Sequence, residues 1–154
     1  MQEISAGEAI RNKIVMGNKR KVSILIPYKI RKGNTLVFLQ KRSKDAKRLP
    51  DYFGFFGGGA EGNENPEDAL RREIKEELNY IPTGYRFLKK YDFTGSIKDI
   101  FFLEVSNDFE KEITVLEGDY GKWFSEREFE KEQKLIEEDK IVLRDLFKLL
   151  KNEK

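Results

Sequence analysis

The sequence predicts a mixed α/β fold in which strands alternate with two or three helices. Three observations lead to this prediction: short runs rich in β-branched and aromatic residues, helix-capping signals ahead of charged segments, and an apolar repeat of helical spacing near the carboxyl end. A length of 154 residues favours a single domain over residues 1–154. With 12 Phe, 6 Tyr and 1 Trp, the chain has enough large apolar side chains to fill a hydrophobic core.

The first predicted element is a β-hairpin. Residues 22–27 and 35–40 have the composition of strands, and the polar segment 31–34 between them contains a glycine suited to a tight turn. The next segment, residues 43–51, is highly charged and contains Pro50, so we expect an exposed loop there.

A short strand and a well-marked helix should follow this loop. Residues 53–56 predict a strand that runs into a flexible turn at the glycines 57–59. Asn65 is a good N-cap, and the proline after it suits the first position of a helix over residues 66–78. Asn79 tolerates the left-handed conformation that often ends a helix.

The second half of the chain predicts more strands and a closing helix. In chain order, the expected elements are strands over residues 85–94, 97–105, 111–116 and 123–124, a short helix opened by the capping box 125–128, and an amphipathic helix over residues 139–151.

The absence of His and Cys excludes several kinds of chemistry. It rules out an imidazole base, a Ser–His–Asp triad, a thiolate nucleophile, a disulfide and any zinc site built on these side chains. Carboxylates, Lys, Arg, Tyr, hydroxyl groups and the backbone remain. Since carboxylates favour hard cations, any metal is expected to be Mg²⁺ or Mn²⁺.

The overall charge gives little sign of a nucleic-acid or membrane partner. There are 30 Lys and Arg residues against 28 Asp and Glu, a formal net charge of +2, so nucleic acid is not the expected partner. No apolar run approaches the length of about 20 residues that spans a membrane, and no signal-peptide pattern is present. We therefore expect a cytoplasmic protein without a membrane partner.

The helix over residues 66–78 carries three glutamates on one side. At about 100° per residue, Glu73, Glu76 and Glu77 fall within an arc of roughly 100°, beside an aliphatic stripe that can face the core. Like charges so close together repel each other, and a divalent cation would turn this repulsion into coordination. In so charged a chain, a solvated acidic face is the ordinary alternative.

The glycines before the helix favour the metal hypothesis. A turn over residues 57–59 would expose backbone carbonyls that can bind a metal ion and backbone amides that can bind phosphate oxygens. Taken alone, three consecutive glycines also fit an ordinary loop.

The spacing of this segment resembles the Nudix box, a signature of Gly, five residues, Glu, seven residues, then Arg-Glu-aliphatic-x-Glu-Glu-x-Gly-aliphatic. The residues in register are Gly58, Glu64, Arg72, Glu73, Ile74, Glu76 and Glu77. Asn79 replaces the usual Gly, which a left-handed C-cap allows, and Tyr80 fills the last apolar position. Phe56 stands where many members have Pro. The resemblance, which covers residues 58–80, implies a Nudix-type α/β/α sandwich around a mixed β-sheet.

The resemblance implies a set of metal ligands. Glu73, Glu76 and Glu77 match the family's divalent-metal ligands, and Glu73 also matches the general base of some members. Gly57, just before the box, matches a position whose carbonyl commonly binds the metal.

It also implies roles for the rest of the box. Arg72 matches the residue that orients the neighbouring glutamate, and Glu64 matches an acid that supports the loop and reaches the metal through water. Gly58 and Gly59, together with Glu64, are expected to lie against the substrate.

A second segment outside the box adds a candidate base. Residues 117–123 resemble a loop of some triphosphate-hydrolysing members, in which the leading Glu binds metal or activates water. Glu117 is therefore an alternative to Glu73 as the base. An ordinary polar turn before a strand anchored by Trp123 would explain the same residues.

Two further side chains are candidates for substrate contact. Phe55 could stack on a base, although packing of Phe53 or Phe55 in the core is the alternative, since strand alternation would point both the same way. Arg42, with Lys44 and Lys47, could hold a terminal phosphate, although exposed loop charges often hold nothing.

The resemblance implies Mg²⁺-dependent hydrolysis of a nucleoside diphosphate linked to another moiety. The loop at Glu117 favours nucleoside triphosphates such as oxidised dGTP. An RNA 5′-end pyrophosphohydrolase and a non-catalytic nucleotide-binding module are the alternatives. The isopentenyl-diphosphate isomerase branch is disfavoured because its chemistry uses a Cys. The resemblance leaves both a monomer and a homodimer open.

Overall fold

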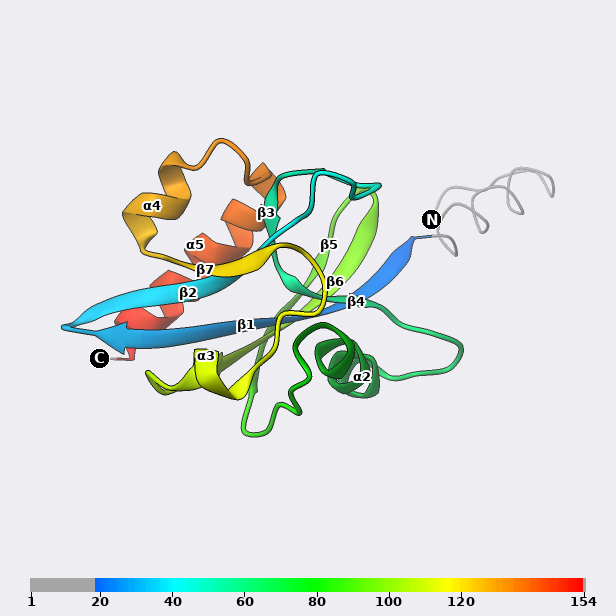
Figure 1. Cartoon of the computed structure of the whole chain (residues 1–154), viewed down its shortest axis with the longest axis horizontal. Coiled ribbons are helices and arrows are strands. Elements are labelled where there is room, and N and C mark those ends of the chain that lie inside the picture. Colours follow the sequence, from blue (N-terminus) through cyan, green and yellow to red (C-terminus); the bar gives the residue numbers. More distant parts are fainter. Residues whose placement is uncertain (1–18, 154) are drawn as a thin grey trace, which may run out of the picture.

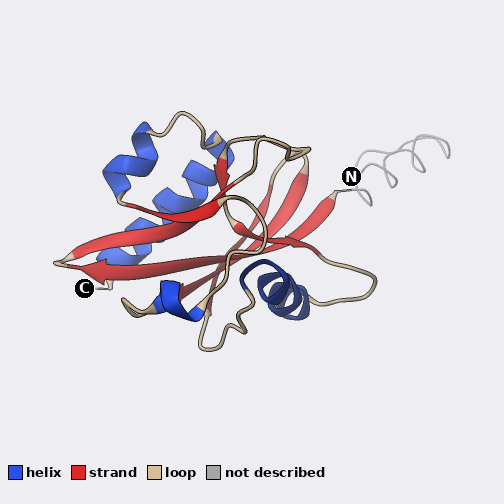
Figure 2. Cartoon of the chain, viewed as in Figure 1, coloured by secondary structure: helices blue, strands red, loops and turns tan. Residues whose placement is uncertain are grey.

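The computed structural model describes residues 19–153, which form a seven-stranded sheet with helices on both faces (Figure 1; Figure 2). The strands are β1 (Arg20–Arg31), β2 (Asn34–Lys41), β3 (Phe53–Gly54), β4 (Phe56–Gly59), β5 (Arg86–Asp92), β6 (Ser96–Glu104) and β7 (Tyr120–Phe124). The helices are α2 (Pro66–Leu78), α3 (Phe109–Glu112), α4 (Glu126–Lys131) and α5 (Glu137–Asn152). The predicted α/β/α sandwich around a mixed sheet is confirmed.

Strand β1 is the centre of the sheet, whose main order is β3-β2-β1-β6-β5. It pairs in parallel with β6, from Arg20 opposite Ser96 to Tyr28 opposite Glu104. On its other edge it pairs antiparallel first with β4 and then with β2, while β7 pairs with β2. The sheet is therefore mixed, and β4 meets β1 beside α2.

Alternate residues of β1 serve two separate cores, as the period of two along a strand requires. Leu25 packs with the aliphatic residues of α2 on one face. Ile24 and Ile26 pack with α4 and α5 on the other face. Each face of the sheet thus has its own buried core.

Several local predictions are confirmed. The hairpin turn consists of Lys32 and Gly33, both with positive φ, at 52° and 79°. Helix α2 has the predicted bounds, and α4 begins at Ser125 with both hydrogen bonds of its capping box. None of the helices in the described part of the chain is long and apolar enough to cross a membrane.

The prediction of a flexible turn at the glycines 57–59 is wrong. These residues form β4, whose register pairs Ser23 with Gly58. Strand β1 lies so close that a Cβ on Gly57, where φ is 136°, would stand 2.1 Å from the Ser23 carbonyl oxygen. Glycine is needed here for close backbone approach and for a positive φ.

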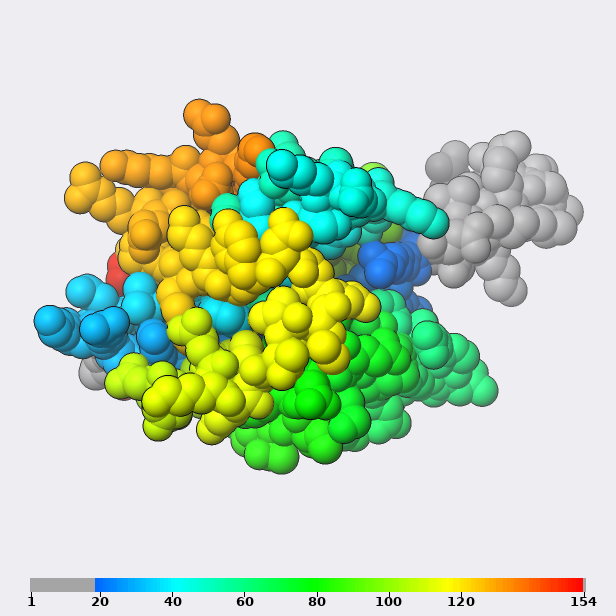
Figure 3. All heavy atoms as spheres, viewed as in Figure 1, coloured from blue at the N-terminus to red at the C-terminus, as the bar shows by residue number. Residues whose placement is uncertain are grey.

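The predicted strand over residues 111–116 is also wrong. Its first residues belong to α3, and the rest crosses the carboxyl end of α2, where the amides of Thr114 and Leu116 donate to the carbonyls of Leu78 (2.9 Å) and Glu77 (2.7 Å). The free carbonyls at the end of the helix thus accept the hydrogen bonds that the carbonyls of a neighbouring strand would otherwise have accepted from these amides. In Figure 3 this part of the chain, in yellow, lies against the green surface of α2.

Candidate functional site

Helix α2 is fixed at both ends by residues of its own sequence. The Asn65 side chain accepts a hydrogen bond from the Asp68 amide at 2.8 Å, and Pro66 occupies the first turn. Asn79 closes the helix with a left-handed φ of 50°. The buried aliphatic residues of the helix face the sheet, and this orientation brings Glu73 and Glu77 toward β4.

Glu77 is a buried carboxylate at the floor of the site, with only 2% of its surface exposed. The Gly57 amide donates to its two oxygens at 3.1 and 3.3 Å. Burial raises the pKa of Glu77 well above its usual range, and the nearby Glu117 and Glu73 raise it further, while the Gly57 amide opposes the rise. Here it is the amide of Gly57, rather than its carbonyl, that contacts a predicted site residue.

Glu73 lies directly over Gly58. A Cβ on Gly58 would stand 2.5 Å from the Glu73 carboxylate, so a larger residue at this position would displace it. Arg72 donates to Glu73 at 3.0 Å. The strand glycine therefore leaves the space in which this carboxylate sits.

Arg72 and Glu64 brace the loop that joins β4 to α2. The Arg72 guanidinium makes a paired contact with Glu64, at 2.8 and 2.9 Å, and donates to the Gly59 carbonyl at 2.9 Å. Glu64 also accepts from the Glu61 amide at 2.8 Å. The hydrogen bond from Arg72, followed by that from Glu61, lowers the pKa of Glu64 to about 2. Both predicted supporting residues therefore engage the loop itself.

Glu76 does not join the other two helical glutamates. Its side chain is 52% exposed and lies 3.4 Å from the Arg72 guanidinium. Although it shares the arc of Glu73 and Glu77, it points along the outside of α2 rather than into the pocket.

Glu117 is brought to the site by the segment that crosses the end of α2. Gln40 donates from its side chain to the Glu117 carbonyl at 3.0 Å. The next residue, Gly118, has a φ of 80° and would bring a Cβ within 2.6 Å of the Lys41 carbonyl oxygen. The loop is therefore held against β2 in one position, with Glu117 beside the pocket.

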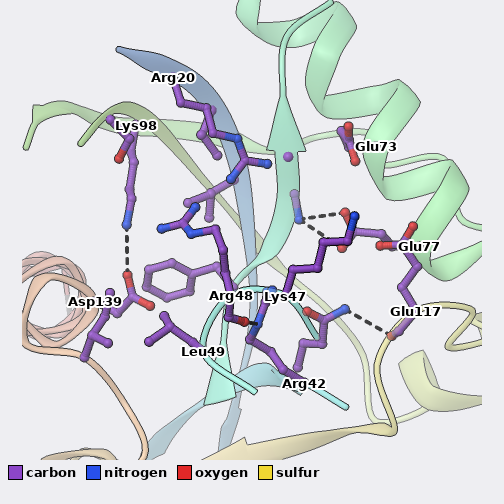
Figure 4. Close-up of a pocket in the computed structure, with 18 residues that line it drawn as sticks. Arg20, Arg42, Lys47, Arg48, Leu49, Glu73, Glu77, Lys98, Glu117 and Asp139 are labelled. Carbon is purple, nitrogen blue, oxygen red and sulfur yellow. Dashed lines mark hydrogen bonds and ion pairs between the residues drawn. The ribbon is translucent and has the colours of Figure 1, made fainter. Parts of the chain in front are cut away.

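A pocket of about 470 Å³ brings most of the predicted residues together (Figure 4). The predicted residues that line it are Gly57, Gly58, Glu73, Glu77, Glu117, Arg42, Lys47 and Phe55. Gly59 and Glu64 instead line a neighbouring hollow of about 610 Å³ together with residues 19–21, and Arg72 and Glu76 line neither. Some residues of the box thus line the pocket, and the others belong to the loop that supports it or lie beside that loop.

Phe53 and Phe55 pack against the same core, as strand alternation predicts, but they are buried to different extents. Phe53 is buried in the core, whereas Phe55 is partly buried and lines the pocket. The reason is that β3 ends at Gly54 and β4 starts at Phe56, so that Phe55 lies at the break between two strands.

Four charged residues of the pocket are not singled out by the sequence pattern: Arg20, Arg48, Lys98 and Asp139. Lys98 lies among apolar residues of a predicted strand, and this is the one local feature that could have marked it as a residue of the site. Asp139 looks like an ordinary acid in the first turn of a helix. Arg48 belongs to the exposed loop over residues 43–51 and Arg20 to the start of β1.

The cations crowd the middle of the pocket. Arg42 donates to the Arg48 carbonyl at 2.7 Å. Burial lowers the pKa of Arg42, and the neighbouring Arg48 and Arg20 lower it further. Such a concentration of positive charge favours an anionic ligand.

The carboxylates beside the pocket are of the chemical type that binds a hard divalent cation. Within residues 19–153, no three carboxylates stand close enough to hold an ion as they are arranged here. Glu73, Glu77 and Glu117 nonetheless gather on one side of the pocket, and their mutual repulsion contributes to the raised pKa of Glu77 (Figure 4). A hard cation such as Mg²⁺ or Mn²⁺ would relieve this repulsion.

Comparison with known proteins gives a consistent assignment. The model of the NUDIX domain family matches residues 19–146. The 8-oxo-dGTP diphosphatase of Escherichia coli (strain K12) is 33% identical over 98 residues, which cover 62% of this chain and 74% of that protein. The 8-oxo-dGTP diphosphatase of Haemophilus influenzae is 33% identical over 70 residues, 45% of this chain and 52% of that protein.

Solved structures show the same fold. The NUDIX domain of Shewanella oneidensis NrtR, in complex with ADP ribose, has a TM-score of 0.70 at 14% identity, covering 96% of this chain and 99% of that one. A C. elegans Ap4A hydrolase has a TM-score of 0.64 at 19% identity, covering 86% and 98%. At these identities the likeness concerns the fold alone.

Proposed function

Because the chain belongs to the NUDIX family, whose members include the diphosphatases it resembles, we propose that it hydrolyses nucleoside diphosphates linked to another moiety, with Mg²⁺ or Mn²⁺ as cofactor. The chain is a Nudix hydrolase acting on phosphoric anhydrides. The proposed substrates are nucleoside triphosphates, with oxidised dGTP as the first candidate, and the names of the two curated relatives support this choice.

The separation of charge within one pocket is the observation that carries the proposal. Carboxylates of α2 and of the Glu117 loop occupy one side, and the cations Arg42, Lys47 and Arg48 lie next to them (Figure 4). A polyphosphate with its metal carries both signs of charge, so it complements both groups at once.

The residues of the site would then have different roles in the reaction. Glu73 and Glu77 would hold the metal, and Glu76 would have to turn inward from its present contact with Arg72 to join them. The Glu73 or Glu117 carboxylate would accept the proton of the attacking water. The cations would orient the phosphate chain and balance its charge. When bound, the divalent ion shields phosphate charge and lowers the pKa of water. Arg72 and Glu64 would act only by fixing the loop.

A substrate panel tests the proposal directly. Product release from dNTPs, 8-oxo-dGTP, ADP-ribose, dinucleoside polyphosphates, nucleotide sugars and 5′-triphosphorylated RNA would be measured with Mg²⁺ and with Mn²⁺, and products identified by mass. We expect turnover of triphosphates to the monophosphate and pyrophosphate. Turnover confined to RNA would favour the 5′-end alternative, and no turnover of any compound would favour a binding module.

Glu77→Gln provides the matching variant. The amide can still accept from the Gly57 amide, and its neutrality suits a buried position, so the fold should be kept. Loss of the charge should lower metal-dependent turnover by about 10²–10⁴-fold. Glu67→Gln, on the first turn of the same helix and bonded to Tyr85 (2.7 Å), is the control and should retain wild-type turnover. Equal activity of the two variants would refute the assignment.

A further inference from the structure

The side of the pocket opposite the carboxylates contains a buried ion pair. Lys98, on β6, donates to Asp139, in the first turn of α5, at 3.2 Å, and it lies 3.5 Å from Glu138. The side chains of Lys98 and Asp139 are only 13% and 8% exposed. Figure 4 shows this pair across the pocket from Glu73 and Glu77, with Arg48 and Lys47 between the two sides.

Stability does not account for this pair. Burial raises the pKa of Asp139, against the opposing effect of Lys98, so the carboxylate is in an unfavourable environment. Replacing a buried ion pair by apolar residues is often neutral or stabilising. Its surroundings in the pocket, Leu49, Phe55 and Ile136, would suit such apolar residues well. The charges therefore call for another explanation.

Both partners keep hydrogen-bonding capacity directed at the pocket. Asp139 uses its Oδ1 atom for Lys98, and its Oδ2 atom has no bond within the described residues. No buried side-chain oxygen among those residues lacks a partner, so Oδ2 is open to the pocket that Asp139 lines. The ammonium of Lys98 has three hydrogens, two carboxylate neighbours and the Phe93 ring at 5.3 Å from its centre, so one hydrogen has no oxygen partner among these contacts. The pair thus presents an acceptor next to a donor.

We propose that Lys98 and Asp139 recognise the base of the substrate and select bases with a lactam edge, a ring C=O adjacent to a ring N–H. This inference rests on the proposed function. The ring N–H would donate to Asp139, and the carbonyl oxygen would accept from Lys98. Guanine adds an exocyclic amine that donates to the same carboxylate. Adenine presents the reverse pattern, with a ring acceptor facing the carboxylate and an amine facing the ammonium.

The rest of this end of the pocket suits a flat base. Phe55 supplies an aromatic ring, and Leu49 and Ile136 supply apolar surface. Stacking on an aromatic side chain is worth about 1–3 kcal/mol per base but does not distinguish between bases. Selection must then come from hydrogen bonding, and a buried site with mismatched partners rejects the wrong ligand strongly.

The test compares deoxynucleoside triphosphates that differ only in the base. We expect kcat/KM for dGTP and dITP to exceed that for dATP by at least about 10²-fold in the wild-type protein. Asp139→Asn can present an amide in either orientation, so it should reduce this ratio by about tenfold or more, mainly through KM. Lys98→Met should raise KM for dGTP and dITP in the same way, and because it removes the mismatch between the ammonium and the adenine amine it should not raise KM for dATP.

A matched control exists on the same strand. Asp99 is buried and paired with Lys90 at 3.1 Å, but it does not line the pocket. Asp99→Asn should leave the ratio of dGTP to dATP unchanged. Thermal unfolding of each variant identifies any that fails to fold, and the two pocket variants test the proposal independently.

Two results separate this proposal from the proposed function. If the wild-type protein hydrolyses nucleotides but Asp139→Asn and Lys98→Met keep the wild-type ratio, base recognition by the pair is refuted and the hydrolase function stands. If no nucleotide is hydrolysed, calorimetric binding of dGMP and dAMP still tests the pair. Equal affinity of the two monophosphates for the wild-type protein would refute it.

Discussion

Replacement of Gly58 by alanine should move the Glu73 carboxylate, a proposed metal ligand and base, without disturbing the fold. The new Cβ would stand 2.5 Å from the Glu73 carboxylate carbon, whereas ordinary contacts begin near 3.4 Å, so the carboxylate must retreat by about 0.9 Å. The atoms that must move are the end of a flexible side chain, and β4 keeps its pairing with β1. The cost in folding free energy should therefore be small.

The cost in activity should be much larger. A misplacement of about 1 Å in a reacting group can lower the rate by about 10²-fold. We therefore expect Gly58→Ala to reduce kcat/KM for Mg²⁺-dependent pyrophosphate release by about 10²-fold. Its thermal unfolding midpoint should remain within a few degrees of wild type. Activity and unfolding would be measured on the same preparation, with the best substrate of the panel.

Gly54→Ala is the matched control for this experiment. Gly54 ends the short strand that precedes β4, and a Cβ there would meet nothing within 4 Å. We expect this variant to retain wild-type activity. If Gly58→Ala is folded and fully active, the position of the Glu73 carboxylate does not matter to the reaction, and the assignment of that residue fails.

Three further perturbations test packing, charge and metal. Gly121→Ala would place a Cβ 2.0 Å from the ring of buried Phe38, so urea unfolding should show a loss of about 1–3 kcal/mol. Hydrogen bonds from Lys134 and Lys41 lower the pKa of Asp51 to about 2, so its stabilising effect, present above pH 3.8, is lost as pH falls through about 2. Asp51→Asn should flatten this part of the acid-unfolding curve between pH 5 and 2. Removal of divalent ions by a chelator should abolish turnover, and added Mg²⁺ or Mn²⁺ should restore it.

Each of these three predictions can be contradicted by a specific outcome. Gly95→Ala, where a Cβ would meet nothing within 4 Å, should leave the urea midpoint unchanged, and the packing argument fails if Gly121→Ala behaves the same way. An acid-unfolding curve that is identical in Asp51→Asn would mean that the pairing does not persist in solution. Turnover that survives exhaustive chelation would overturn the role of the metal.

The failures of sequence reasoning share one physical cause. The segment over residues 111–116 has the composition of a strand, but the free carbonyls of α2 take up its amides. Gly57 has the freedom of a turn residue, yet pairing with β1 places it in a strand. Both outcomes depend on partners distant in the sequence, which local propensity does not describe.

The sequence by itself determined helix α2, its caps and the spacing of its glutamates, because these features depend on residues within a few positions of one another. It also determined the family, since the same spacing carries the Nudix box. The tertiary structure alone decided that Glu76 turns outward and that Lys98 and Asp139 meet across the pocket from Glu73. Glu76 turns outward because the apolar side of α2 packs on one face of the sheet, whereas Lys98 and Asp139 meet because β6 pairs with β1 and α5 packs on the other face. Both arrangements depend on contacts between residues distant in the sequence, which form only when the whole chain folds.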